Sequence, residues 1–241
     1  MLLVNVFSPV CSLGALLLLA ACAETEPDTV ELDPFFPEDA GAIIAPVPLA
    51  EASELDGQLF PSYLLTTQSG CSYPAIDNPT ILDEFSAEWY GSHLNAAGEP
   101  PLTELAAGSP ERLHIRFIWL RTFDQPMIVR IHEDGPGQAS IEAKRLSGAG
   151  GYEPGEFLRT LERELSSAEW EDLMAVIAEN DLENEAAVSC NIGNDGAQWI
   201  LEVVENGDYS FYERWTPETG NVRNLGLHLL QLTGWNLEPI Y

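Results

Sequence analysis

Apolar and polar residues alternate along the middle of the chain. From 113 to 119 every odd position carries a large apolar side chain: Leu113, Ile115, Phe117 and Trp119. The alternation continues over 126–133 and 140–146, and the two intervening segments, 122–124 and 134–137, are rich in turn-forming residues. A period of two indicates β-strands with one buried face. These segments therefore predict an antiparallel meander.

A second hairpin is predicted near the C-terminus. Segments 197–204 and 209–215 flank Asn206-Gly207, a pair that favours a two-residue type I′ turn. Both faces of this hairpin carry large apolar side chains, so we expect it in a central position, covered on both sides. Segment 157–165 is compatible with one further strand.

Helical spacing takes over at three places. A helix is expected over 167–179, where Ser166 and Glu169 match a capping box. Leucines at helical spacing predict another over 221–233. A first helix is expected to begin at Thr80, acting as the N-cap, and to end before Gly98. The order of elements predicts an α+β fold, with an antiparallel sheet of about five to six strands and three helices packed against it.

Charge excludes some classes of partner. Lys and Arg number 10 and Asp and Glu number 39, which gives a formal net charge of −29. A protein that binds nucleic acid needs a basic face for the phosphates, so we expect no nucleic-acid partner. The same surplus disfavours electrostatic binding to anionic lipid. The interpretation that requires no specific partner is that the acidic surface is an adaptation to a salty or alkaline habitat.

The N-terminus combines an apolar run with a cysteine. Residues 1–23 carry no charged side chain, and the run Leu16-Leu17-Leu18-Leu19 leads into Ala20-Ala21-Cys22. This pattern resembles the lipobox of bacterial lipoprotein precursors. The resemblance implies cleavage before Cys22, lipid on its thiol and acylation of the freed amine. Two alternatives remain, namely a plain cleaved signal peptide and an uncleaved N-terminal transmembrane helix.

These features predict three parts of the chain. Residues 1–21 are expected to be a lipoprotein signal peptide. Residues 22–57, acidic and rich in proline, are expected to be a disordered tether, and 58–241 a single α+β domain. Ala23 follows the cysteine, and by resemblance to enterobacterial lipoproteins this favours an outer-membrane location facing the periplasm.

The cysteines agree with export. Of the four cysteines, Cys11 would leave with the signal peptide and Cys22 would carry lipid. Cys71 and Cys190 remain, and in an oxidising compartment they predict a disulfide, with two separate buried thiols as the alternative. A Cys-x-x-Cys pair does not occur in the sequence, so a zinc ribbon or a thioredoxin-type site is unsupported. We expect neither a bound metal nor another cofactor.

The first hairpin brings basic residues together. If 122–124 form its loop, His114 faces His132 and Arg116 faces Arg130, all on the side opposite to the apolar face. One interpretation is an anion-binding site for a carboxylate, a phosphate or a sugar acid. The alternative is a ladder of cross-strand salt bridges, with Glu142 opposite Arg130.

The second hairpin offers a pair of carboxylates. With Asn206-Gly207 as the turn, Glu202 and Glu213 are diagonal neighbours on one face, about 7–8 Å apart at Cα. Two carboxylates near Trp215, which could stack on a sugar, suggest a hydrolase site as an alternative function. Salt bridges to arginines are the competing interpretation.

Several segments resemble a bacterial family of hypothetical proteins and lipoproteins. They are Gly148-Ala149-Gly150-Gly151-Tyr152, the run from Asp195 to Glu202, and Arg214-Trp215-Thr216-Pro217. The resemblance covers roughly residues 80–233 and implies no activity. The sequence thus predicts a lipid-anchored envelope protein that is a non-catalytic binding or assembly module. Its expected partners are the membrane, through the lipid, and a small anionic or sugar ligand or an envelope protein; an envelope hydrolase is the alternative.

Overall fold

The structure is a computed structural model that describes residues 41–52, 58–73 and 76–241. All of them belong to one compact unit. The predicted signal peptide, Cys22 and most of the predicted tether lie outside the described residues.

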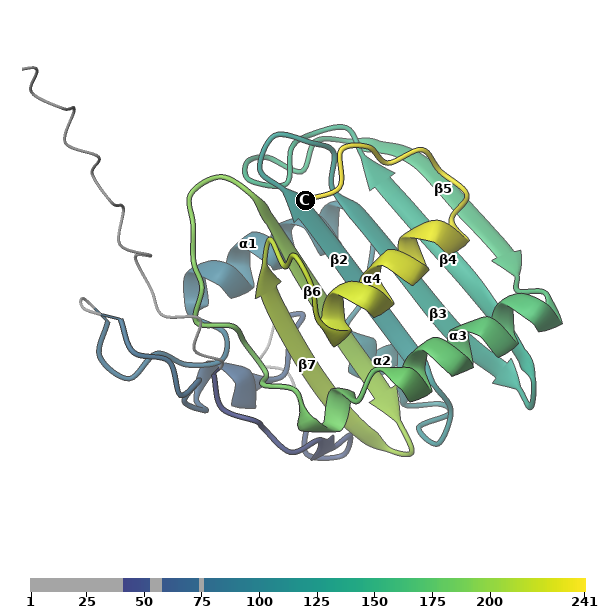
Figure 1. Cartoon of the computed structure of the whole chain (residues 1–241), viewed down its shortest axis with the longest axis horizontal. Helices are drawn as coiled ribbons and strands as arrows, with labels where there is room; N and C mark the ends of the chain where they lie inside the picture. Colours follow the sequence, from purple (N-terminus) through teal and green to yellow (C-terminus); the bar gives the residue numbers. More distant parts are fainter. Residues whose placement is uncertain (1–40, 53–57, 74–75) are drawn as a thin grey trace, which may run out of the picture. The chain divides into compact units, whose positions relative to one another are not determined.

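One antiparallel sheet organises the domain (Figure 1). Its seven strands run in the order β1-β7-β6-β2-β3-β4-β5. They are β1 (Val47–Pro48), β2 (His114–Arg121), β3 (Met127–Gly135), β4 (Gln138–Leu146), β5 (Phe157–Glu164), β6 (Ala197–Glu205) and β7 (Asp208–Trp215). The α+β class is confirmed, and the sheet has more strands than expected. The extra strand is the short β1, whose two residues show no alternating pattern that could reveal it.

The predicted tether contributes to the folded domain. Val47 pairs with Tyr209 of β7, the amide of Gly41 donates to the carbonyl of Val188, and Ala52 is buried. The reason is that the outer edge of β7 has backbone groups in need of partners, and an extended segment can supply them despite its prolines. The folded domain therefore includes residues 41–52, in contrast to the predicted start at 58.

Helices cover both faces of the sheet. The helices are α1 (Glu84–Ala96), α2 (Leu102–Ala106), α3 (Ser167–Glu179) and α4 (Asn221–Leu232), with 3₁₀ turns η1 (Ser62–Leu65) and η2 (Leu182–Asn184). In Figure 1, α3 and α4 lie on one face, and α1 and α2 lie on the other. No helix in the described part of the chain is long and apolar enough to cross a bilayer.

The first helix begins later than predicted. Asp83 is its N-cap, because its carboxylate accepts a hydrogen bond from the amide of Ser86 at 2.7 Å. The hydroxyl of Thr80 donates instead to the carbonyl of Leu82. Ile81 and Leu82, expected in the helix, lie before it and are buried. They form a bend before α1 and pack in the hydrophobic cluster on that side of the sheet.

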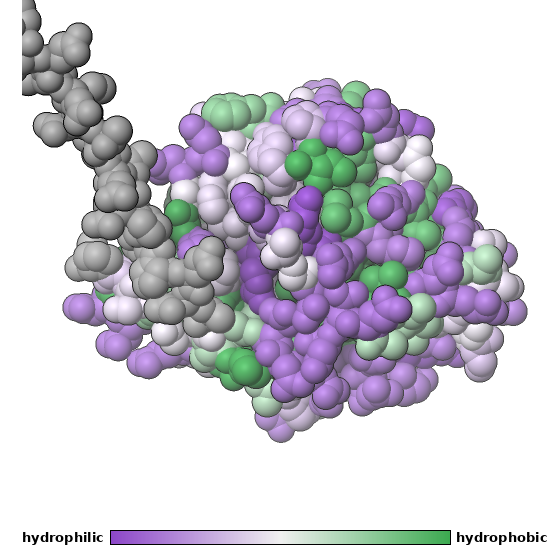
Figure 2. Space-filling model, viewed as in Figure 1, coloured by the Kyte–Doolittle hydropathy of each residue, from purple (hydrophilic) through white to green (hydrophobic). Residues whose placement is uncertain are grey.

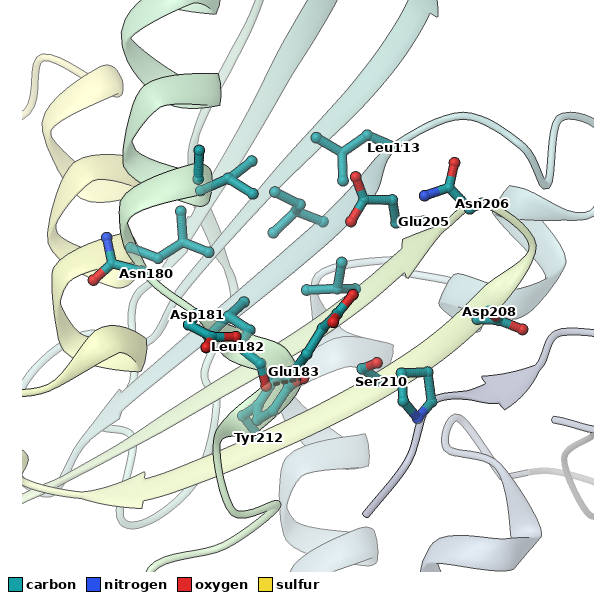
Figure 3. A pocket seen from close by; sticks show the side chains of 16 residues that line it. Leu113, Asn180, Asp181, Leu182, Glu183, Glu205, Asn206, Asp208, Ser210 and Tyr212 are labelled. Carbon is teal, nitrogen blue, oxygen red and sulfur yellow. Dashed lines mark hydrogen bonds between the residues drawn. The ribbon is translucent and has the colours of Figure 1, made fainter. Parts of the chain in front are cut away.

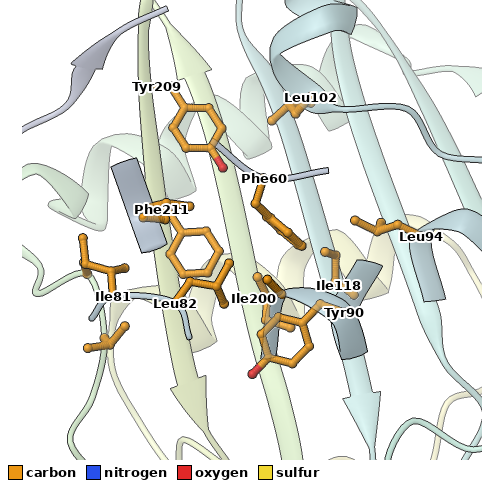
Figure 4. Packing of buried hydrophobic residues seen from close by; sticks show 14 of the residues in the cluster. Phe60, Ile81, Leu82, Tyr90, Leu94, Leu102, Ile118, Ile200, Tyr209 and Phe211 are labelled. Atoms are coloured by element: carbon orange, nitrogen blue, oxygen red, sulfur yellow. The ribbon is translucent and has the colours of Figure 1, made fainter. Parts of the chain in front are cut away.

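Two hydrophobic cores flank the sheet. On the α1 side, Phe60 makes edge-on contacts with Tyr90 and Phe211 (Figure 4). On the α3 and α4 side, Trp119 and Trp199 are fully buried. Every residue of β2 is buried. The polar face of the meander is therefore covered by the N-terminal half of the domain, whereas the sequence predicted a single buried face.

Local pairing follows the predicted register. His114 lies opposite His132, Arg116 opposite Arg130, and Glu202 opposite Phe211. Asn206 and Gly207 have φ values of 53° and 87°, as a type I′ turn requires. The capping box of Ser166 and Glu169 is present at the start of α3.

A disulfide joins distant parts of the domain. Cys71, in the N-terminal layer, is bonded to Cys190, in the loop before β6, and 119 positions separate the two in the sequence. The bond ties the layer that contains α1 to the sheet region.

Candidate functional site

The predicted arginine pair lies inside a network of ion pairs. Nε of Arg116 donates to Oε2 of Glu202 at 2.6 Å, and both side chains are fully buried. Oε1 of Glu202 accepts from the hydroxyl of Tyr209 at 2.8 Å. Nη1 of Arg116 donates to the carbonyl of Pro100, in the loop after α1. The guanidinium therefore ties β2 to β6 and to that loop.

Glu99 extends this network to the neighbouring strands. It is almost fully buried and accepts from Nη1 of Arg130 at 2.8 Å and from Nζ of Lys144 at 2.6 Å. Glu142 lies opposite Arg130, as predicted, and forms ion pairs with both Arg130 and Lys144. The network holds three carboxylates and three cations, so it is balanced.

This balance bears on the predicted anion site. The carboxylates that Arg116 and Arg130 require are supplied by the chain itself, in an arrangement that matches the salt-bridge alternative. Binding of an external anion by these arginines stays a prediction that requires the pairs to open.

The two predicted histidines form a contact of their own. Nδ1 of His114 and Nδ1 of His132 are 3.1 Å apart, and the ring centroids are 4.6 Å apart. Nε2 of His114 is 3.1 Å from the carbonyl oxygen of Ser109. His114 is buried, and burial lowers its pKa, whereas the side chain of His132 is 37% exposed and has Asp134 beside it.

The two glutamates of the alternative hydrolase site lie in different surroundings. Glu202 is engaged by Arg116 and Tyr209. Glu213 is partly buried beside Tyr90, and burial raises its pKa to about 7 while the hydroxyl of Tyr90 offsets part of that rise. Trp215 packs closely on the backbone of Gly193 and Gly196. These contacts favour a structural role for Glu202 and for Trp215.

The structure contains a cavity that the sequence did not reveal. It has a volume of about 440 Å³ and lies between the C-terminal end of α3, η2 and strands β2, β6 and β7 (Figure 3). Its apolar lining consists of Pro46, Leu113, Ile115, Ile177, Ala178, Leu182, Val203, Tyr212 and Leu225. Its polar lining consists of Asn180, Asp181, Glu183, Glu205, Asn206, Asp208 and Ser210. Every charged residue of this lining is acidic.

The negatively charged side chains of the cavity repel one another. Figure 3 shows the carboxylates of Glu183 and Glu205 directed into the cavity. The pKa of Glu205 is raised, first by burial and then by the charges of Glu183 and Glu133. The hydroxyl of Tyr212 donates to the carbonyl of Leu182 at 2.9 Å and holds η2 in place as one wall. A cation in the cavity would relieve this repulsion.

Sequence reasoning missed the cavity because its walls come from five separated parts of the chain. The one available sign was the placement of acids directly after the 167–179 helix and on both sides of Asn206-Gly207. That sign is weak in this chain, because most of the face in Figure 2 is hydrophilic and acids are common throughout.

The described residues contain no cluster of three or more His, Cys, Asp or Glu side chains suited to a metal ion. No known family model matches the chain, and none of the curated proteins matches it.

Proposed function

We propose that this protein is a lipid-anchored binding module of the bacterial cell envelope, and that its ligand site is the cavity between α3 and strands β6 and β7. The proposed ligand is a small organic cation with an apolar part. The observation that carries the proposal is the lining of the cavity, which joins an apolar floor to carboxylates without any basic side chain.

Size and chemistry support this ligand class. Sites for small molecules have volumes of roughly 300–1,000 Å³, mostly apolar walls and a few convergent polar groups. The floor around Ile115 and Val203 can bury a short hydrocarbon chain, and each buried CH₂ contributes about 0.8 kcal/mol. Glu183 and Glu205 can pair with an ammonium or guanidinium group. An anion of the same length would be repelled.

A pair of probes of equal length tests the ligand class. We expect hexylammonium to raise the melting temperature of the protein in a concentration-dependent way, because a ligand that binds only the folded state stabilises it. Hexanoate should have no such effect. Equal shifts with both compounds, or none with either, would refute the proposal.

Matched variants locate the binding. Glu205→Gln removes one charge inside the cavity and should weaken hexylammonium binding several-fold. Glu171→Gln removes one charge from the exposed side of α3, outside the cavity, and should leave binding unchanged. If both variants weaken binding equally, overall charge rather than the cavity attracts the probe.

The lipid anchor is supported by the run of leucines and alanines before Cys22. Two lipid-type signals suffice for stable anchoring, and the family's modification supplies three acyl chains. The test uses the full chain in a bacterium that processes lipoproteins. Cys22→Ser should abolish cleavage and detergent partitioning, while Cys11→Ser should leave both intact. Unchanged partitioning of the Cys22→Ser variant would contradict the anchor, and fractionation of the membranes would test the proposed outer-membrane location.

The alternative of an envelope hydrolase has one observation in its favour. The pKa of Glu213, raised to about 7, suits a general acid. It requires Glu202 to leave Arg116 and Tyr209 before the two carboxylates could act together. Hydrolysis of envelope glycans that is lost in Glu213→Gln would favour this alternative.

A further inference from the structure

The contact between His114 and His132 has one consistent arrangement of protons. Nε2 of His114 is 3.1 Å from the carbonyl oxygen of Ser109 and 3.2 Å from its Oγ. The carbonyl oxygen can only accept, and the hydroxyl can accept as well. The arrangement that satisfies both therefore has a hydrogen on Nε2 of His114 and a free lone pair on its Nδ1. Nδ1 of His132 must then donate to Nδ1 of His114 across the 3.1 Å separation. In this arrangement both hydrogen bonds are satisfied.

One proton fits this arrangement and a second does not. A first proton can enter at Nε2 of His132, where the carboxylate of Asp134 lies 3.5 Å away. A second proton would have to enter at Nδ1 of His114, which already faces an N–H group. It would also place two positive rings with centroids 4.6 Å apart, one of them buried. Double protonation therefore breaks the contact.

The remaining charges near the pair act in both directions. Glu133 favours the protonated form of His114, whereas Arg112 opposes it. The carboxylate of Asp134 lies 3.5 Å from Nε2 of His132. Each histidine also has a neighbour on its other side in the sheet. Val204 of β6 lies opposite His114, and Ser140 of β4 lies opposite His132; neither carries a charge.

The pair is connected to the cavity through a short loop. Ser109, the partner of His114, is followed by Pro110, whose carbonyl accepts a hydrogen bond from the amide of Gly207 at 2.8 Å. Gly207 lies in the turn between β6 and β7, and its neighbours Asn206 and Asp208 line the cavity. The loop from 107 to 113 thus holds the turn that forms one side of the cavity.

We propose that His114 and His132 form a proton-operated latch. At acidic pH, a proton on each ring separates the rings and frees the Ser109–Pro110 segment. The Asn206-Gly207 turn is then released at the edge of the cavity. The part of this inference that concerns ligand binding rests on the proposed function, while the opening of the turn does not.

Hydrogen exchange of the full chain in detergent, without any ligand, tests the latch. The measured quantity is the exchange rate of peptides that cover 205–209, corrected for the intrinsic effect of pH. One proton taken up on opening can raise the opening constant at most tenfold per pH unit, and only at pH values below the pKa of a solvent-exposed histidine. Over the interval from pH 7 to pH 5 we therefore expect about tenfold faster exchange. Peptides from α4 should show no such change.

Three variants separate the latch from other titrations. In His132→Gln, the amide can donate to His114 or accept from it and cannot become charged, so the pH dependence should be lost. His228→Gln, on α4, should retain it. Glu205→Gln should retain it too, which distinguishes the latch from titration of the cavity carboxylate.

Each outcome decides for or against the latch. A pH-independent exchange rate in the native chain would overturn it, as would an unchanged pH dependence in His132→Gln. Loss of the pH dependence in Glu205→Gln alone would assign the effect to the cavity. Because no ligand is present, failure of the proposed ligand class would leave this result intact.

Discussion

Nε of Arg116 lies 2.6 Å from Oε2 of Glu202, and neither side chain is exposed to solvent. The two residues face each other across β2 and β6, at the centre of the sheet. Removing one partner of a buried pair leaves an uncompensated charge, whereas removing both leaves only a packing defect. The pair therefore couples the two halves of the sheet strongly.

Breaking this pair should be far more destabilising than breaking a partly exposed one. We expect Arg116→Met to lower the free energy of unfolding by about 3–5 kcal/mol. The double variant Arg116→Met with Glu202→Leu should lose less than the single variant. Glu185→Gln, which breaks the partly exposed pair with Arg214, should cost about 1 kcal/mol or less. Urea denaturation measures all three, and a double variant that loses as much stability as Arg116→Met alone would argue against the coupling.

Glu213 should make stability depend on pH. Its pKa in the folded state is about 7, above its ordinary value of 4.5. Between these values the folded state keeps a proton that the unfolded state has lost, so stability decreases as pH rises from about 4.5 to 7. Glu213→Gln mimics the protonated form. It should leave stability unchanged near pH 4 and increase it by up to about 3 kcal/mol at pH 8.

Melting temperatures at pH 4, 6 and 8 check this prediction. Glu171→Gln, at an exposed position on α3, provides the control and should shift stability equally at each pH. A Glu213→Gln variant with no pH-dependent gain would show that the carboxylate is well solvated.

Loss of the disulfide should strongly destabilise the domain. Cys71 and Cys190 close a loop across 119 positions. A crosslink of this span lowers the entropy of the unfolded chain and thereby stabilises the folded state by about 4–5 kcal/mol. Cys71→Ser, Cys190→Ser and the double variant should therefore be equally destabilised. Denaturation with and without reductant measures the effect, and a reductant that does not alter the native chain would contradict it.

The N-cap of α3 should make a smaller, local contribution. Oγ of Ser166 accepts from the amide of Glu169, and the Glu169 carboxylate accepts from the amide of Ser166. Ser166→Ala should cost about 1 kcal/mol. Ser167→Ala, one position into the helix, should be neutral or slightly stabilising, because alanine has the higher helix propensity. Equal losses of stability in the two variants would show that the N-cap hydrogen bond does not stabilise α3.

Short-range pairing could be read from the sequence because it depends on neighbours along the chain. The Asn206-Gly207 turn sets the register of its hairpin, so the diagonal placement of Glu202 and Glu213 followed from counting. The same holds for His114 opposite His132 and for the cap at Ser166. Alternation and turn residues determine which positions face each other within a hairpin.

Long-range neighbours were decided by the tertiary structure. The Pro100 carbonyl and Glu99 meet Arg116, Arg130 and Lys144 only because the chain packs α1 and its following loop over the polar face of the meander. Strand β1 was missed because two residues carry no periodicity, and the cavity because its walls come from segments far apart in the sequence. The sequence by itself determined the longer strands and helices, their pairing within hairpins and the acidic charge. Which carboxylates became buried partners and which remained to line a cavity depended on how the layers close over the sheet, since desolvation and charge pairing arise only between groups that folding brings together.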